Sequence, residues 1–237
     1  MKNTFFTSSL KPLLCALLFT IPNQVNAVPA ELDTKTSKYY NFLKKKPKGL
    51  MFDRFYEAWL NHSTAAELEL FLQNAEVSGS ENDSLLLAYF YQRQGDDLKA
   101  LTAISKALKT SRKAEILLHK AKLEARMLNL EQSVKDLKIA QKDPDASAET
   151  MLQVSRFLGT CLARTGKLKQ ASEVWNKLLD KNVGDPDLID EIIDMQLKES
   201  MYQEAIVTAD KLIAVAKSPY KKVLYRLRKG DVYQRAG

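Results

Sequence analysis

A fixed spacing of residues recurs along the last two thirds of the sequence. Each copy begins with a residue that is small in four of the five copies. A turn position follows it seven residues later. In the first four copies a second small residue follows at the twelfth position. The starts are separated by 33, 38, 34 and 37 residues. Self-similarity at a period of about 35 residues predicts a repeat architecture. The five copies begin at Ala88, Ala121, Gly159, Ile193 and Gly230.

The composition and the offsets predict that each copy is a pair of antiparallel helices. Glycine and proline are scarce, at 8 and 7 residues in the chain, so helices should dominate. A left-handed residue ends the first helix at the turn position, and small residues let the two helices approach closely. One pair cannot hide its large apolar residues alone, so they bury against the next pair. The turn positions are Gly95, Leu128, Gly166, Ser200 and Gly237.

The segment from Leu158 to Leu178 carries the fullest version of the pattern. It reads Leu-Gly-x-x-Leu-x-x-x-Gly-x-x-x-x-Ala-x-x-x-Trp-x-x-Leu and resembles the tetratricopeptide repeat. The resemblance covers residues 81–237. It implies an all-α fold, an α-solenoid of antiparallel helix hairpins that form a right-handed superhelix. Leu128 in place of glycine, and Ile193 in place of a small residue, depart from the family pattern and predict looser packing or a shifted register there.

The last copy of the pattern ends at its turn position, Gly237. It would supply only the first helix of a fifth, incomplete repeat. Because solenoid ends usually carry a polar capping helix, Leu224, Leu227 and Val232 are expected to be partly uncovered. Either another chain covers this edge, which includes self-association, or the natural chain continues past Gly237. We favour the second explanation.

Residues 49–80 lack the seven-and-twelve spacing and are expected to form an atypical N-terminal hairpin that caps the array. Met51, Phe55 and Trp59 give the first helix an apolar face. Thr64, with Glu67 three residues later, predicts a capping box at the start of the second helix. Residues 28–48 are interpreted as a basic linker because of the run Lys44–Gly49; a membrane-surface or nucleic-acid role is the alternative.

Residues 1–27 have the composition of a cleaved signal peptide. Lys2 and Lys11 precede an apolar run from Leu13 to Ile21, and Ala27 provides a small residue for cleavage. The alternative, an uncleaved membrane anchor, is disfavoured because the run is about nine residues long and a spanning helix needs about 20. We therefore expect an exported protein with no transmembrane segment after cleavage, periplasmic or extracellular in a bacterium.

The mature chain has a modest basic excess and one cysteine. Removal of residues 1–27 removes two lysines and no acids, so 34 basic and 29 acidic residues remain, a net charge of +5. This excess suits solubility or weak affinity for anionic surfaces and is too small for a dedicated nucleic-acid binder. Cys161 lies in an apolar helical stretch and is expected to be buried.

The sequence shows no pattern typical of catalysis, of a metal site or of a cofactor. His62 and His119 are not paired at metal-ligand spacing, and no glycine-rich phosphate loop or nucleophile turn occurs. Residues 143–154 begin like a calcium loop, but the sixth position is not glycine and the last is Val154. We therefore expect neither an enzyme nor a cofactor, and a binding function instead.

The family resemblance implies that the first helices of successive hairpins line a concave groove. A basic residue stands two positions before each turn position. This column is either a cationic ladder for an acidic ligand or a set of cations that stabilise helix C-termini by about 0.3 to 1 kcal/mol each. The candidate groove residues are Tyr89, Arg93, Lys122, Arg126, Arg156, Thr160, Arg164, Asp190, Asp194, Lys198, Asp231 and Arg235.

Three functions are compatible with these features. The first is a non-catalytic scaffold of the periplasm or cell envelope that binds a protein or peptide partner in the groove. The second is the N-terminal repeat module of a longer protein whose missing C-terminal region carries an enzymatic or envelope-assembly activity. The third is a basic solenoid on an anionic polymer, with nucleic acid the least expected ligand in an exported protein.

Overall fold

The computed structural model describes residues 33–77, 80–111 and 113–237, and the predicted signal peptide lies outside these ranges. The described residues form helices and connecting turns, without strands. None of these helices is both long enough and apolar enough to cross a membrane. The helices are α1 (Thr34–Lys45), α2 (Gly49–Leu60), α3 (Ala65–Val77), α4 (Glu81–Arg93), α5 (Asp97–Thr110), α6 (Ala114–Arg126), α7 (Leu130–Ala140), α8 (Ala148–Arg164), α9 (Leu168–Lys181), α10 (Pro186–Lys198), α11 (Tyr202–Ala214) and α12 (Pro219–Ala236).

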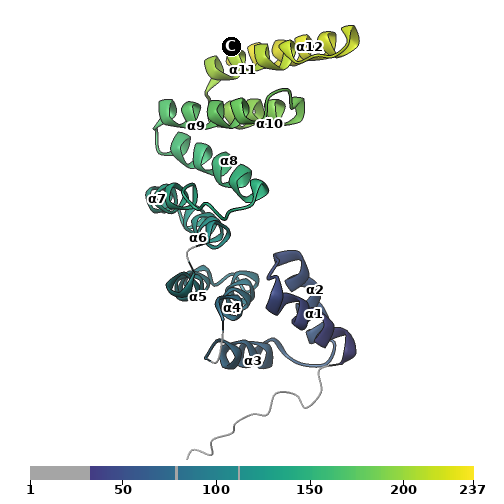
Figure 1. Ribbon diagram of the computed structural model, residues 1–237, viewed down its shortest axis with the longest axis vertical. Coiled ribbons are helices and arrows are strands. Elements are labelled where there is room, and N and C mark those ends of the chain that lie inside the picture. Colours follow the sequence, from purple (N-terminus) through teal and green to yellow (C-terminus); the bar gives the residue numbers. More distant parts are fainter. Residues whose placement is uncertain (1–32, 78–79, 112) are drawn as a thin grey trace, which may run out of the picture. The chain divides into compact units, whose positions relative to one another are not determined.

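The helices from α4 onward form the predicted hairpins. α4 pairs with α5, α6 with α7, α8 with α9 and α10 with α11, and each pair is joined by a short turn (Figure 1). The second helix of each hairpin also contacts the first helix of the next one. That contact is extensive between α7 and α8 and between α11 and α12, and it is slight between α9 and α10. The all-α repeat fold predicted from the spacing is therefore confirmed.

The small residues of the pattern lie where the two helices of a hairpin approach each other. Ala88, Ala121 and their counterparts at offset twelve are fully buried. The Ser133 hydroxyl donates a hydrogen bond to the carbonyl oxygen of Ala121 at 2.9 Å, which joins α7 to α6. In the third hairpin Gly159 faces the indole of Trp175. This indole N–H donates to the carbonyl oxygen of Arg156 at 3.3 Å.

The turn positions all adopt the left-handed conformation that the pattern predicts. The backbone φ angle is +77° at Gly95, +75° at Gly166, +64° at Leu128 and +59° at Ser200. At each of these four turns the next residue donates its N–H to a carbonyl five positions earlier, as Asn129 does to Glu124 at 2.8 Å. The register therefore does not shift at Leu128 or Ser200, and of the two predicted alternatives only looser packing stays a prediction. The hydrogen bonds of the turn fix the register. The non-glycine residues adopt the left-handed conformation in spite of its cost in backbone free energy.

Replacement of Leu128 by glycine is expected to stabilise the protein by about 1 kcal/mol. A side chain in the left-handed region costs about 1–2 kcal/mol, and glycine carries no such cost. The Leu128 side chain is 83% exposed, so its removal forfeits little packing. Chemical denaturation measures the gain. Leu128→Ala is the matched control, because alanine keeps the backbone penalty; an equal gain in both variants would contradict this explanation.

The N-terminal region differs from the linker predicted for residues 28–48. Thr34–Lys45 form the helix α1, and the Asp33 carboxylate caps it by accepting hydrogen bonds from the N–H groups of Lys35 and Thr36 at 2.7 and 3.2 Å. Leu43 is fully buried, and Tyr40 packs its ring against aromatic residues of α2 and α3. The linker interpretation is wrong here because few apolar residues, spaced at helical intervals, suffice to dock a polar helix.

The segment 49–80 contains the two helices that the sequence predicts. The capping box is confirmed: the Thr64 N–H donates to Glu67 Oε2 at 2.8 Å, and the Glu67 N–H donates to Thr64 Oγ1 at 3.2 Å. The main helix partner of α2 is α1, whereas α3 packs against α4. Trp59 and Phe71 join α2 to α3 with ring centroids 5.1 Å apart. The role of this segment as a cap for the array stays a prediction.

The last helix, α12, is packed on one side only. Leu224 and Leu227 are 37% and 63% exposed, as expected. Val232 was expected to be uncovered as well, but it is fully buried and belongs to the same core as α10 and α11. The helix is also held by the Arg228 guanidinium, which donates to Asp190 at 2.6 Å and to Asp194 at 2.5 Å.

Candidate functional site: a lysine-lined pocket

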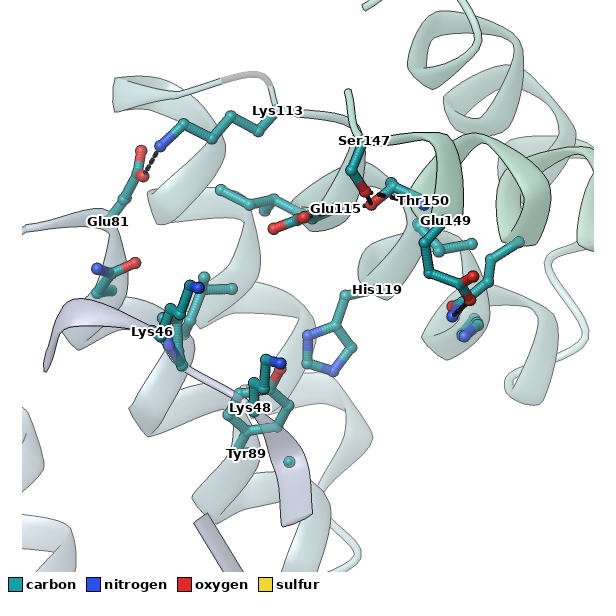
Figure 2. Close-up of a pocket in the computed structure, with 18 of the residues that line it drawn as sticks. Lys46, Lys48, Glu81, Tyr89, Lys113, Glu115, His119, Ser147, Glu149 and Thr150 are labelled. Atoms are coloured by element: carbon teal, nitrogen blue, oxygen red, sulfur yellow. Dashed lines mark hydrogen bonds and ion pairs between the residues drawn. The ribbon is translucent and has the colours of Figure 1, made fainter. Parts of the chain in front are cut away.

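A pocket of about 840 Å³ lies against the first helices of three successive hairpins. Residues of α4, α6 and α8 line it, together with the connection between α1 and α2 (Figure 2). A cavity of this size is typical of ligand sites, which usually measure about 300–1,000 Å³. The first helices therefore form one side of a candidate binding surface, and the α1–α2 connection forms a wall of it.

The wall is fixed by contacts between the α1–α2 connection and α4. The Asn82 side-chain amide donates to the carbonyl oxygen of Lys44 at 2.8 Å. Pro47 follows the end of α1, and α2 begins at Gly49. A Cβ atom at Gly49 would lie 3.7 Å from the ring of Tyr89, so the start of α2 is in close reach of α4. These contacts hold the lysines of the connection at the edge of the pocket.

Tyr89 and His119 link the wall to α6. The Tyr89 ring packs between Phe52 and His119, with centroid separations of 5.9 Å and 4.7 Å, and it stacks on the imidazole. His119 Nε2 lies 2.7 Å from the Gln92 amide nitrogen, so the amide donates to the neutral imidazole. Burial, followed by the charges of Lys122 and Arg126, lowers the pKa of His119 to about 4. His119 is therefore neutral at physiological pH.

Acidification is expected to destabilise the protein through His119. A histidine with a folded-state pKa near 4 and an ordinary pKa of 6.5 binds its proton more readily in the unfolded chain. Its contribution to stability is complete above pH 6.5 and falls as the pH drops towards 4. At pH 5 the loss is about 2 kcal/mol relative to pH 7. Denaturation of the wild type and of His119→Phe at both pH values measures this loss. If the free energy of unfolding depends equally on pH in the two proteins, the loss does not come from His119.

The pocket has more lysines than its own carboxylates neutralise. Lys113 forms an ion pair with Glu81. Lys45, Lys46, Lys48 and Lys122 have no ion pair with any residue in the described part of the chain. Burial lowers the pKa of Lys122, because the protein removes water from its ammonium without supplying a counter-charge.

The opposite side of the pocket carries carboxylates and hydroxyls. Figure 2 shows Lys46, Lys48 and Tyr89 on one side, and Ser147, Glu149 and Thr150 on the other. The Thr150 hydroxyl donates to Glu115 Oε1 at 3.2 Å, and the Gln153 amide donates to Glu149 Oε1 at 2.8 Å. Both carboxylates keep free acceptor capacity, since a carboxylate has about four lone-pair sites. The pocket is therefore polarised, basic at the wall and acidic at the first turns of α6 and α8.

Only two of the twelve sequence-predicted groove residues, Tyr89 and Lys122, line this pocket. Three members of the predicted cationic ladder form ion pairs within the protein instead. Arg93 pairs with Asp53 and lies 4.5 Å from the centroid of the Tyr56 ring. Arg126 pairs with Asp97, and Arg164 with Glu199 at 3.1 Å. The ladder thus connects neighbouring helices. Its last two members, Lys198 and Arg235, form no ion pair among the described residues.

The remaining predicted groove residues lie on α8, α10 and α12. Arg156 forms an ion pair with Glu191, which connects α8 to α10. Asp190 and Asp194 bind Arg228 as described above. The Thr160 hydroxyl donates to the Arg156 carbonyl at 3.2 Å within its own helix, and Asp231 is exposed on α12. A ligand-binding role for these residues stays a prediction.

Sequence reasoning missed the lysines of the α1–α2 connection and His119. The signal was present as the run Lys44–Gly49. The run by itself predicts a linker, because the pattern does not show that Asn82, 38 residues away from Lys44, anchors it beside α4. His119 was considered only as a metal ligand, although it lies four residues after Glu115 and three before Lys122, on one face of α6.

The cysteine of the described structure is buried, and its potential metal ligands are dispersed. Cys161 is buried, as predicted, with its sulfur 3.4 Å from the Ser133 hydroxyl, and burial raises the pKa of its thiol. A raised pKa keeps the thiol protonated and unreactive. Within the described ranges, no three histidine, cysteine or carboxylate side chains gather in a way that could hold a metal ion.

Solved structures of tetratricopeptide-repeat proteins are similar to this chain. PilF of Pseudomonas aeruginosa superposes with a TM-score of 0.54 and 20% identity, over 85% of this chain and 88% of PilF. PilW, described as a widely conserved type IV pilus biogenesis factor, gives a TM-score of 0.53 at 17% identity, over 86% of this chain and 90% of PilW. YrrB, a tetratricopeptide-repeat protein with an unusual peptide-binding site, gives 0.50 at 14%, over 83% of this chain and 99% of YrrB.

These similarities and the hairpin geometry show that the chain has the tetratricopeptide-repeat fold. At identities of 20% and below, the likeness concerns the fold alone. No protein-family model and no curated protein sequence matches the chain.

Proposed function

We propose that this protein is a non-catalytic scaffold of the bacterial periplasm or cell envelope that binds a protein or peptide partner in the lysine-lined pocket. The observation that carries the proposal is the pocket on the first helices of three successive hairpins, where the Tyr89 ring stacks on His119 and several lysines have no ion pair among the described residues. Tetratricopeptide-repeat structures supply such surfaces for other proteins, and YrrB is described as having a peptide-binding site. The predicted signal peptide supports export.

Photo-crosslinking in intact cells tests the proposal. A photoreactive amino acid replaces Gln153, which lines the pocket on α8, and in a second strain it replaces Ile139 on α7. Ile139 is 49% exposed and outside the pocket, so it is the matched control. A discrete adduct with a periplasmic protein or peptide from position 153, and none from position 139, is the expected result. Absence of an adduct at 153, or equal adducts at both positions, would refute binding in this pocket.

A further inference from the structure

We infer that the pocket recognises an acidic peptide segment, whose carboxylates bind the lysines of the α1–α2 connection and Lys122. This inference rests on the proposed function and specifies the partner's chemistry. Its basis is the charge arrangement: the wall carries Lys46 and Lys48, and α6 adds Lys122, none with an ion pair in the described structure. All three lysines are exposed, and their ammonium groups border one pocket, so together they attract a carboxylate more strongly than a single surface lysine does.

The start of α2 adds to the positive end of the pocket. Lys48 is the N-cap residue of α2, and its side chain makes no capping hydrogen bond. The first N–H groups of a helix carry a partial positive charge. At Gly49 these groups lie beside Tyr89 at the pocket edge. An acidic side chain bound between Lys46 and Lys48 would meet this helix end as well as the two ammonium groups.

The opposite end of the pocket favours a peptide over a uniform polyanion. Glu115 and Glu149 line the pocket on α6 and α8, where they would repel a chain of phosphates, sulfates or carboxylates. They accept N–H groups, as a peptide backbone or a basic side chain would provide. Leu85 and Tyr89 add apolar surface for a side chain between the two ends. The geometry thus points to a segment that is acidic at one end and neutral or basic at the other.

Binding of synthetic peptides to the mature chain tests the charge preference. The probes are dye-labelled peptides of about ten residues, an extended length of about 33 Å. Each has a Leu-Tyr centre; one carries Glu and Asp in its first half, a second carries Gln and Asn there, and a third carries Lys. Fluorescence anisotropy at about 0.15 M salt measures affinity, since screening there is physiological. The acidic peptide is expected to bind at least about tenfold more tightly than the neutral one.

Charge reversal in the wall locates the site. In Lys46→Glu/Lys48→Glu, the affinity for the acidic peptide is expected to fall by at least about tenfold and that for the Lys peptide to rise. The matched control is Lys217→Glu/Lys222→Glu, which makes the same charge change at exposed positions outside the pocket. It is expected to change the affinity by less than about twofold. An equal loss in both variants would overturn the site. Thermal melting confirms that both variants are folded.

The crosslinking experiment separates failure of this inference from failure of the proposed function. Suppose that the pocket adduct at position 153 persists in Lys46→Glu/Lys48→Glu and that the three peptides bind equally. The pocket then binds a partner, but not through acidic residues of that partner, and the inference is overturned. If heparin displaces the acidic peptide more effectively than unlabelled peptide of equal charge, the site serves an anionic polymer, and the inference is also overturned. Loss of the adduct together with peptide selectivity supports it.

Discussion

Replacement of Lys120 by methionine is expected to destabilise the protein by about 4 kcal/mol at pH 7. The Lys120 ammonium lies between α6 and α7, where it binds Glu124 at 2.7 Å and also Asp136. Both carboxylates are buried, so the variant leaves two desolvated negative charges without a counter-ion. Removal of one partner from a buried network is costly because the others cannot regain their hydration. Urea denaturation measures the loss.

The pH dependence of this loss identifies its cause. In the wild type, burial raises the pKa of Glu124, with Lys120 opposing the shift. Without Lys120 this pKa rises further. A raised folded-state pKa means that the folded protein accommodates this carboxyl best when it is protonated. Its contribution to stability is therefore retained below its unfolded pKa and is lost as the pH rises. The destabilisation should therefore be smaller at pH 4 than at pH 7. A loss independent of pH would indicate a packing defect instead.

Two further variants control for the lysine-to-methionine change itself. Lys135→Met alters an exposed residue of α7 and is expected to change stability by less than about 0.5 kcal/mol. Glu124→Gln in the Lys120→Met background removes one of the stranded charges and should recover part of the lost stability. No recovery would mean that the unpaired charge does not account for the effect.

Replacement of Gly159 by alanine is expected to destabilise the protein by about 3 kcal/mol. A Cβ atom there would lie 2.7 Å from Cδ1 of Trp175 and still closer to the indole nitrogen, which is closer than real Cβ atoms approach other heavy atoms. Trp175 is fully buried and its N–H is bound to Arg156, so the ring cannot move without loss of packing and of a hydrogen bond. Overpacking of a dense core costs about 1–3 kcal/mol, and more where the neighbour is rigid.

Gly230 supplies the matched control for Gly159. It occupies the same position of the repeat pattern in α12, but no heavy atom lies within 4 Å of a Cβ placed there. Gly230→Ala should therefore stabilise the protein by about 0.5–1 kcal/mol through helix propensity alone. The two substitutions are chemically identical and are predicted to have opposite signs. Thermal and urea denaturation of both variants measure this; equal signs would contradict the packing argument.

The fold was predictable because the sequence encodes each hairpin locally. The turn position and the two small residues lie within twelve positions of each other, and backbone sterics act over that range. The same local logic shows why Leu128 did not shift the register: the flanking helices are fixed by buried residues, and the turn residue adopts the conformation that they require. Helix α1 was missed because its docking depends on Tyr40 and Leu43, two apolar residues in a polar segment.

The candidate binding surface was predictable only in outline. The first helices do line the pocket, but which cations remain available depends on ion pairs between residues far apart in sequence. Arg126 and Asp97 are 29 residues apart, and Arg164 and Glu199 are 35 apart. No helical period relates such partners, so the sequence did not show that these arginines are neutralised. The lysines without ion pairs lie instead in the run that had been assigned to a linker.

The slight contact between α9 and α10 has a consequence for cooperativity. In a repeat protein, interfaces between neighbouring units couple the folding of one unit to that of the next. Few contacts at one interface lower this coupling there. The pocket lies entirely on the N-terminal side of this boundary. The core that runs from α6 to α12 and the ion pairs of Arg156 with Glu191 and of Arg164 with Glu199 still join the two sides, so the stability of α10–α12 is coupled to that of the pocket through α8 rather than through α9.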